Sequence, residues 1–328
     1  MSEAFSVKPL SSAKPASGWS RVRQEWETEG AKGVALWAME WTLWKTNLYQ
    51  AMSGPTAERV QARFRYARRV KKYGIDQPII VYQFGKVGST TMQRSLAALR
   101  LNVPVYQLHF LNEADQIEQW AKHTLRDPSR VLRMVALSRR VRRALESSHP
   151  PRYNLVCLVR APVPRNISMF FENVDSYVPH LDERYANHTV SYAEIRERFL
   201  NEFLEDTPNF WFDREVKEVF GLDVYAEAFD KARGYQIYEN ARARLIVIRL
   251  EDLNRVAADA MRAFLGIPDF QLVRANIGET NAYGALYKDF LNELRLPNEY
   301  IEDTNNKPYA QHFYTPQELD ASVARWRA

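Results

Sequence analysis

The pattern of hydrophobic and polar positions alternates between short apolar runs and longer segments with helical spacing. Runs rich in β-branched and aromatic residues predict strands at residues 79–82, 103–110, 155–159 and 245–250. The third run is apolar throughout, as expected for a strand that is covered on two faces. Because the runs alternate with helical segments, the sequence predicts βαβ units and an α/β fold with a central, mainly parallel sheet.

Capping residues and glycines set the bounds of several predicted helices. Ser191 with Glu194 forms one capping box, and Thr315 with Glu318 forms another ahead of the last helix. A glycine after the last apolar helical position, as at Gly266, predicts a stop. The expected helices cover 92–99, 112–125, 131–146, a segment from about Pro164, 191–203, 212–221, a segment that ends at Gly266, 282–294 and a segment from Thr315.

The chain divides into three predicted segments. Residues 1–18 carry Ser, Ala, Pro and Gly without periodicity and are expected to form a flexible leader. Helical spacing begins near residue 19, so residues 19–75 are expected to form a helical N-terminal extension. Residues 76–328 then form the α/β domain.

Two stretches of the predicted extension leave alternatives open. A stripe of Trp37, Trp41, Trp44 and Leu48 packs on the domain or on a second subunit, or it rests at a membrane interface. Residues 57–72 carry many Arg and Lys side chains with interleaved aromatics. A solvated or membrane-facing helix surface is favoured over nucleic-acid binding there, because no recognised nucleic-acid module surrounds the charges.

Composition narrows the class of protein. Hydrophobic residues make up 46% and charged residues 26% of the 328 positions, which is ordinary for a globular protein with a sizeable core. The net charge of +5 suits a phosphorylated ligand, an acidic polymer, an anionic membrane or nucleic acid, and does not choose among them. Cys157 is the only cysteine, which excludes an intrachain disulfide, and we expect it to be buried in the third strand.

Localisation and partners follow from what the sequence lacks. It has no uninterrupted apolar run of about 18 residues and no N-terminal signal pattern, so a cytoplasmic protein is expected. The Trp stripe leaves peripheral contact with the inner face of the membrane open. We expect no nucleic-acid partner, and the oligomeric state stays open, with a dimer as one alternative.

The stretch from Pro78 to Thr91 has the layout of an anion-binding site. A predicted strand leads into a loop of small residues that holds Lys86, and a helix begins beyond the loop. This layout points backbone N–H groups and the positive end of a helix dipole at an anion. The sequence therefore predicts a site for a phosphorylated ligand.

Two features separate this loop from that of the P-loop NTPases. Their signature places the lysine after the second glycine, whereas Lys86 precedes Gly88. An NTPase also needs an Asp at a neighbouring strand end to hold Mg²⁺, whereas the third strand ends in Arg160. Arg160 and Ser168 predict a second anion-binding corner, so a donor nucleotide with two separate phosphates and no metal fits better than ATP.

The two motifs together resemble those of the sulfotransferase superfamily. Phe84–Thr91 resembles the 5′-phosphosulfate loop of that superfamily, and Leu158–Ser168 resembles its 3′-phosphate motif, with Ala161 where Asp is usual. This departure weakens any part that the side chain has in bracing the turn. The stretch from about 78 to 320 is also similar to a bacterial family of putative capsular polysaccharide synthesis proteins.

The resemblance implies a P-loop-like three-layer fold that binds 3′-phosphoadenosine 5′-phosphosulfate. Such a protein transfers the sulfonate to a hydroxyl of a carbohydrate acceptor, here a capsular or other cell-surface polysaccharide. Lys86 then stabilises the leaving group as a catalytic residue. The residues that the resemblance assigns to the nucleotide are Gly85, Lys86, Val87, Gly88, Ser89, Thr90, Thr91, Arg160 and Ser168.

The catalytic base and the activity itself leave alternatives open. His109 ranks first as base, because it ends the second predicted strand at the edge where open α/β sheets place ligands. The alternatives are Glu113, Glu172 and His312. Glu251 and Asp252 are expected to be helix N-terminal caps. The competing functions are a P-loop kinase that uses ATP and Mg²⁺, and a non-catalytic nucleotide-binding scaffold in polysaccharide assembly.

Overall fold

The core of the protein is a five-stranded, mostly parallel β-sheet. The computed structural model describes residues 31, 38, 75, 77–113, 116–118, 129–147, 152–203, 205–273 and 284–327. The strand order is β2-β1-β3-β5-β4, and only β4 runs antiparallel to its neighbour. The strands are β1 (Ile79–Tyr82), β2 (Val105–Leu108), β3 (Tyr153–Val159), β4 (Tyr235–Glu239) and β5 (Ala243–Arg249).

All four predicted strands are confirmed, and β4 was missed. Its sequence, Tyr-Gln-Ile-Tyr-Glu, is short and includes polar residues, and the strand lies at the edge of the sheet. Every residue of β3 is buried, including Cys157, as predicted for a strand in the middle of a covered sheet. The predicted leader and most of the predicted extension, with the Trp stripe and the basic stretch, lie outside the described residues.

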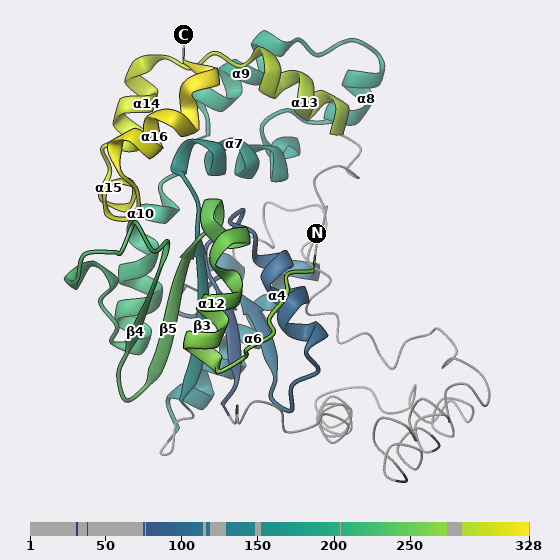
Figure 1. The fold of residues 1–328 in the computed structure, drawn as a ribbon. Helices are drawn as coiled ribbons and strands as arrows, with labels where there is room; N and C mark the ends of the chain where they lie inside the picture. Colours follow the sequence, from purple (N-terminus) through teal and green to yellow (C-terminus); the bar gives the residue numbers. More distant parts are fainter. Residues whose placement is uncertain are drawn as a thin grey trace.

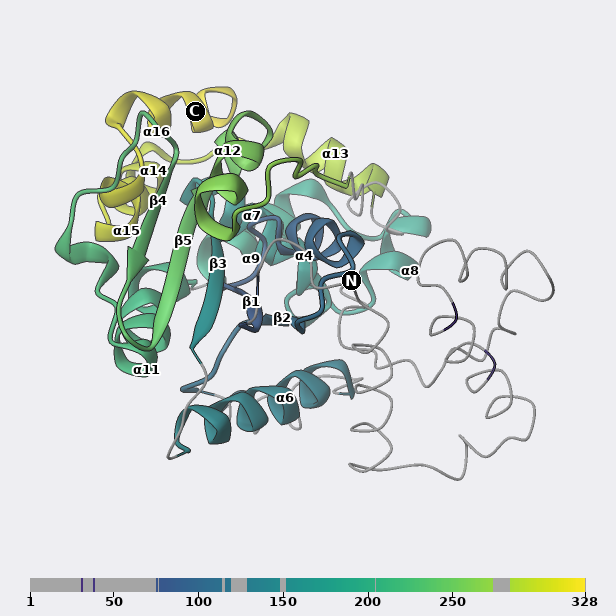
Figure 2. The same ribbon diagram turned by 60° about the horizontal axis from the view of Figure 1, so that its bottom comes forward.

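Helices cover the sheet on two faces. In Figure 2, α4 (Ser89–Ala98) and α12 (Leu253–Leu265) lie on one side of the strands. On the other side lie α6 (Ser129–Leu145) and a continuous helix made of α10, a π-helical segment and α11. The bounds of this composite helix are Thr207–Trp211, Phe212–Lys217 and Glu218–Phe220. The predicted α/β arrangement with a mainly parallel sheet is therefore confirmed.

A second layer of helices lies beyond the carboxyl ends of the parallel strands (Figure 1). It contains α7 (Pro162–Glu172), α8 (Leu181–Ala186), α9 (Tyr192–Asn201), α13 (Gly284–Glu293), α14 (Asn298–Asn305) and α16 (Pro316–Val323). These helices share a hydrophobic cluster of their own, separate from the cluster around the sheet. The short α15 (Pro308–Phe313) packs its aromatic residues into the sheet cluster. Single 3₁₀ turns occupy Val174–Ser176, Val224–Ala226, Leu250–Asp252 and Ala324–Trp326.

Most predicted helix ends agree with the structure. Ser191 accepts a hydrogen bond from the Glu194 N–H, and Thr315 and Glu318 form a full capping box at α16. Gly266 ends α12 in the left-handed conformation. The helix that was predicted to begin near Phe212 begins at Thr207, because Pro208 occupies a first-turn position and favours an earlier start. Within the helix predicted at 112–125, residues 116–118 are helical and most of the others lie outside the described residues.

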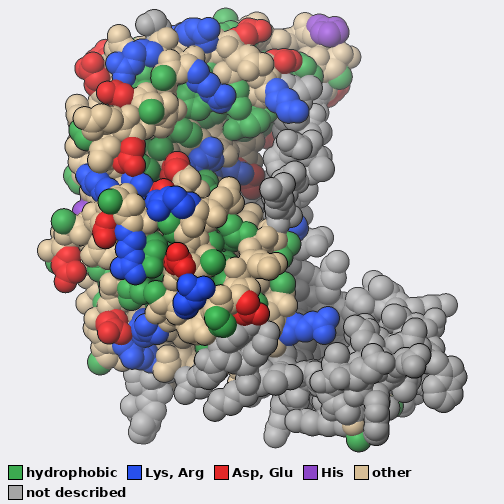
Figure 3. Space-filling view, viewed as in Figure 1, with side chains coloured by type: hydrophobic (Ala, Val, Ile, Leu, Met, Phe, Trp, Pro, Cys, Tyr) green, Lys and Arg blue, Asp and Glu red, His purple; other side chains and the backbone are tan. Residues whose placement is uncertain are grey.

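Two features concern the expected partners: the distribution of surface charge and the hydropathy of the helices. Lys and Arg side chains lie interspersed with Asp and Glu over the face seen in Figure 3, so the positive charge is not gathered into one patch on that face. None of the helices in the described part of the chain is long and apolar enough to cross a membrane.

Gly266 provides a direct test of the backbone requirement at the end of α12. Its φ is 68°, and nothing lies within 4 Å of the position that a Cβ would take. Gly266→Ala should therefore lower the free energy of unfolding by about 1–2 kcal/mol through backbone strain alone. Gly266→Asn should cost less, since Asn tolerates this conformation. Chemical denaturation measures both changes, and equal losses for the two variants would contradict the explanation.

Candidate functional site

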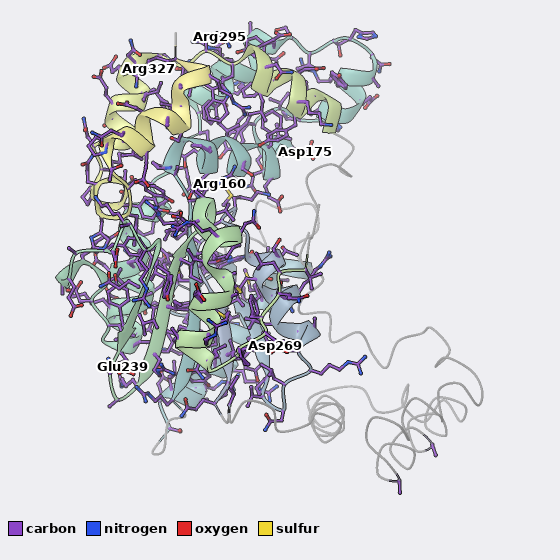
Figure 4. The ribbon with its side chains drawn as sticks, viewed as in Figure 1. Arg160, Asp175, Glu239, Asp269, Arg295 and Arg327 are labelled. Atoms are coloured by element: carbon purple, nitrogen blue, oxygen red, sulfur yellow. The ribbon has the colours of Figure 1, made fainter. Side chains whose placement is uncertain are left out.

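The candidate site lies where the chain leaves neighbouring strands in opposite directions. β1 stands between β2 and β3, so the segments that follow β1 and β3 lie next to each other at the carboxyl edge of the sheet, where open α/β sheets bind ligands. Figure 4 places Arg160 at this edge, just below α7. Its guanidinium Nη1 donates a hydrogen bond of 3.2 Å to the carbonyl oxygen of Lys86. The structure thus brings together the two motifs that the sequence predicted to form one site.

The loop between β1 and α4 has a backbone that favours anion binding. Lys86 and Gly88 have φ of 69° and 92°, and Gly88 is the N-cap of α4. No side chain caps this helix, and no acidic residue stands in its first turn. A Cβ on Gly88 would lie 2.6 Å from Leu250, so only glycine fits there. The positive end of the α4 dipole is therefore not neutralised by an acidic residue in its own first turn.

One face of α7 lies against this loop. The Arg165 Nε donates a hydrogen bond of 3.2 Å to the Gly85 carbonyl, and the Lys86 Nζ lies 3.1 Å from the Glu172 carboxylate. Ser168 is three residues after Arg165 and four before Glu172, so it shares their helix face. The structure therefore places Ser168 on the same face of α7 as two contacts with the loop.

Arg165 is a buried structural cation. Its side chain is 1% exposed, it pairs with Glu205 at 3.2 Å, and its guanidinium lies 5.3 Å from the centre of the Phe84 ring. Burial lowers the pKa of Arg165, and the Glu205 carboxylate opposes this shift. With its charge paired, Arg165 supports the loop through Gly85.

The turn after β3 is held by side chains that the sequence did not reveal. The Tyr309 hydroxyl accepts a hydrogen bond from the Arg160 N–H at 2.9 Å and donates one to the Arg160 carbonyl at 2.8 Å. The Glu251 carboxylate accepts from the Ala161 N–H at 2.9 Å and from the Tyr314 hydroxyl at 3.0 Å. These contacts brace the turn although Ala161 stands where Asp is usual in the resembling motif.

The prediction that Glu251 and Asp252 cap a helix is wrong for the side chains. Asp252 stands at the N-cap of α12 but makes no capping hydrogen bond there. Its carboxylate pairs instead with Arg249 and Arg255. Ion pairs with two arginines nearby in the sequence, and the bond of Glu251 to the Ala161 N–H, engage these carboxylates in place of the capping bonds that the local pattern predicted.

His109 lies at the same edge, just past β2. Its Nδ1 is 2.6 Å from the Gln83 carbonyl oxygen, and its own carbonyl accepts a hydrogen bond of 2.7 Å from the Trp211 indole. Because a carbonyl can only accept, Nδ1 carries the proton of this bond, and a neutral ring then has its lone pair on Nε2. The side-chain amide of Gln83 is buried next to the loop and has no hydrogen-bond partner among the described residues.

Glu215 anchors the segment that follows His109, and no sequence signal identified it. Its Oε2 accepts from the N–H groups of Leu111 and Asn112 at 2.6 and 2.9 Å, and its Oε1 accepts from the Glu113 N–H at 3.1 Å. The Tyr82 hydroxyl donates to the same carboxylate at 2.5 Å. Glu215 is buried in the π-helical segment, a rare structure that is frequent at functional sites.

The charge state of Glu215 reflects two opposing effects. Burial raises the pKa of this carboxyl group, while the hydrogen bonds from Tyr82 and from the three N–H groups favour the ionised form and oppose the shift. Burial and the nearby carboxylate also raise the pKa of the Tyr82 hydroxyl. The contacts hold the chain between β2 and residue 113 against the composite helix.

The alternative bases have other partners. The Glu113 carboxylate pairs with Arg214 at 2.6 Å, and Glu172 pairs with Lys86. His312 is packed against Tyr225 and Phe229, and burial lowers its pKa. Among the described residues, no group of three or more His, Cys, Asp or Glu side chains has the arrangement to hold a metal ion.

Fold and site together define a mixed α/β protein with the basic residues Lys86 and Arg160 at the carboxyl edge of a mostly parallel sheet. Residues 182–315 match the model of the NKWYS family, described as "Putative capsular polysaccharide synthesis protein". The match covers less than half of the chain and supports the resemblance over that segment. It does not include Lys86, His109, Arg160 or Ser168. Searches of curated proteins and of solved structures found no match.

Glu215→Gln tests the role of the buried carboxylate. The amide NH₂ of Gln cannot accept a hydrogen bond, so a buried N–H or O–H group loses its acceptor. We expect a loss of about 1–3 kcal/mol in the free energy of unfolding. The exposed Asp213→Asn in the same helical segment should change it little. Denaturation of the two variants under one condition makes the comparison.

The same variant should alter the pH dependence of stability. The raised pKa means that folded Glu215 keeps its proton to higher pH than the unfolded chain does. Its contribution is then fully present below the ordinary pKa of 4.5 and is lost as the pH rises towards the folded value. Denaturation between about pH 4 and pH 7 should show this decline in the wild type and a weaker decline in Glu215→Gln. Parallel curves would contradict the assignment.

Proposed function

We propose that this protein is a sulfotransferase that uses 3′-phosphoadenosine 5′-phosphosulfate as its donor and a carbohydrate hydroxyl as its acceptor. The observation that carries the proposal is the contact between Arg160 and the Lys86 backbone at the carboxyl ends of β1 and β3. It joins two basic corners next to a helix N-terminus that has no acidic residue in its first turn. The description of the fold as P-loop-like is part of this proposal.

The residues present fit a nucleotide with two separated phosphate groups. N–H groups of the loop and of Ser89, Thr90 and Thr91 bind the 5′-phosphate at the α4 N-terminus. Arg160 and Ser168, which flank the loop from β3 and from α7, bind the 3′-phosphate. The buried, unpartnered amide of Gln83 beside the loop is a further polar group of the kind found near ligands or ordered water.

The chemistry is divided between the donor and the chain. When bound, the donor supplies an activated sulfonate whose departure leaves negative charge on a phosphate oxygen. The Lys86 ammonium group stabilises that charge. The turn that presents Lys86 is fixed by the bonds of Arg160 and Arg165 to neighbouring carbonyl groups, so little reorganisation is needed.

His109 is the proposed general base for the acceptor hydroxyl. Its bond to the Gln83 carbonyl fixes the tautomer in which Nε2 can accept a proton. Trp211 and Glu215 hold the backbone that directly follows the ring's attachment point. The orientation of His109 therefore rests on contacts with buried groups of a neighbouring helix.

The acceptor class rests on the family match. Residues 182–315 contain α8, α9 and the composite helix, and these elements lie beside or above the carboxyl edge of the sheet. A family described by capsular polysaccharide synthesis supports a glycan acceptor that meets the donor from this side. A cytoplasmic location, with peripheral contact at the inner membrane face, suits the building of such a polymer.

Two other functions remain as alternatives to the proposal. A P-loop kinase would need a carboxylate for Mg²⁺ at the end of β3, where Arg160 stands. A scaffold that binds the nucleotide without catalysis would use the same loop and the same arginine. Metal dependence separates the first alternative from the proposal, and transfer to a glycan panel separates the second.

Binding of 3′-phosphoadenosine 5′-phosphate tests the two-phosphate site. Lys86→Ala and Arg160→Ala should each weaken binding by about 10- to 100-fold, because each removes a charged hydrogen-bond donor from a phosphate. Lys288→Ala, at an exposed position of α13, should leave affinity unchanged. Calorimetric titration measures all four proteins. Equally poor binding by wild type and Lys86→Ala would reject the proposal.

Magnesium decides between the proposal and the kinase. Binding of the bisphosphate nucleotide should be the same in EDTA and in Mg²⁺, since its proposed partners are N–H groups and basic side chains. A kinase would instead bind ATP only with Mg²⁺. Mg²⁺-dependent ATP binding with no affinity for the bisphosphate nucleotide would favour the kinase.

His109→Gln tests the proposed base separately from donor binding. Loss of a general base should lower kcat/KM for sulfonate transfer by about 10²- to 10⁴-fold. Affinity for the bisphosphate nucleotide should stay within about twofold of the wild type, because His109 is not assigned to either phosphate. Transfer of labelled sulfonate to a glycan panel provides the rate. An unchanged rate would exclude His109, and tight binding with no transfer by any protein would favour the scaffold.

A further inference from the structure

The ammonium group of Lys86 already has an anionic partner in the structure. Its Nζ lies 3.1 Å from the Glu172 Oε2, and each of the two side chains is 30% exposed. The pair closes from the last turn of α7 onto the loop that precedes α4. The group proposed to meet the donor's leaving oxygen is therefore held by a carboxylate of the same chain.

The position of Glu172 is set by the helix rather than by a mobile segment. Two turns earlier on the same face, the buried Arg165 binds the Gly85 carbonyl. Met169, on that face as well, is close enough to Gly85 that a Cβ there would lie 2.8 Å from its terminal carbon. With α7 fixed at these two points, the Glu172 carboxylate cannot leave the loop without a change of rotamer or of the helix itself.

The electrostatic consequence concerns any anion that enters the loop. A phosphate near Lys86 gains an attractive interaction with the ammonium group and a repulsive one with the Glu172 carboxylate. An incoming phosphate must also compete for a donor that already has a partner. Glu172 therefore lowers anion affinity at this corner, whereas it keeps the Lys86 side chain ordered at the loop.

We propose that Glu172 is a positioning residue that orders Lys86 in the donor-free protein and competes with the donor for its ammonium group. The inference rests on the proposed function, because it assigns a role to Glu172 through the donor-binding Lys86. Glu172 should lower the affinity for the donor and for the bisphosphate product. In return it should keep the Lys86 side chain in position and speed the release of the product.

Glu172→Gln separates this role from a structural one. Removal of the competing charge should tighten binding of 3′-phosphoadenosine 5′-phosphate by about two- to fivefold, the range expected for a partly exposed ion pair. A variant that merely damaged the fold would bind more weakly. Glu172→Asp keeps the charge and should bind more like the wild type. Glu183→Gln, an exposed charge-matched change in α8, controls for the altered net charge.

A double-mutant cycle shows whether the effect passes through Lys86. In the Lys86→Ala background, Glu172→Gln should change affinity by less than half of its effect in the wild-type background, because the partner is gone. Calorimetric titration at low and at moderate salt measures all variants, and the gain should shrink as salt rises.

The outcomes distinguish this inference from the proposed function. If wild type binds the bisphosphate nucleotide but Glu172→Gln binds equally or more weakly, the role of Glu172 is refuted and the sulfotransferase proposal stands. An equal gain in the Lys86→Ala background would also refute it, since the effect would then be a general change of charge. If wild type does not bind the nucleotide at all, the proposed function fails, and the inference that rests on it fails with it.

Discussion

The geometry of the candidate site depends on the interactions of the buried Arg165 guanidinium group. It binds the Gly85 carbonyl in the loop after β1 and pairs with Glu205 just ahead of α10. A buried charge is costly when it loses its partner, by about 3–5 kcal/mol in comparable ion pairs. These contacts therefore fix the position of α7 relative to the loop. The positions of Ser168 and Glu172 on α7 follow from it.

The candidate site is divided between the segments that form it and the residues that support those segments. The candidate site itself is formed by the segments that follow β1, β2 and β3, and several of their residues are buried in the core around the sheet. Their backbones are also held by side chains from distant parts of the chain: Tyr309 and Glu251 at the end of β3, and Trp211 and Glu215 beyond β2. Such support restricts the motion that residues on loops otherwise have.

The sequence predicted those parts whose signals are local. The apolar runs identified four strands, and the glycines identified the helix stops. The anion site at the loop with Lys86 stays a prediction. The contacts that hold the site are between residues far apart in the chain, as for Tyr82 with Glu215 or Arg160 with Tyr309. No local pattern marks these partners, since a buried glutamate in a helix looks like any other glutamate until the fold is known. β4 was not predicted because its five-residue sequence is short and includes polar residues.

The family match gains meaning from this division. The matched segment, 182–315, contains the supporting residues Glu205, Trp211, Glu215, Glu251 and Tyr309, and it leaves out the loop and the end of β3. The match therefore concerns the part of the chain that supports the candidate site. The two basic corners of the candidate site lie outside the matched segment and are built from a helix N-terminus and a few basic residues. Glu172 connects the two parts. It lies on α7, which Arg165 holds against the loop, and its carboxylate pairs with Lys86 in that loop.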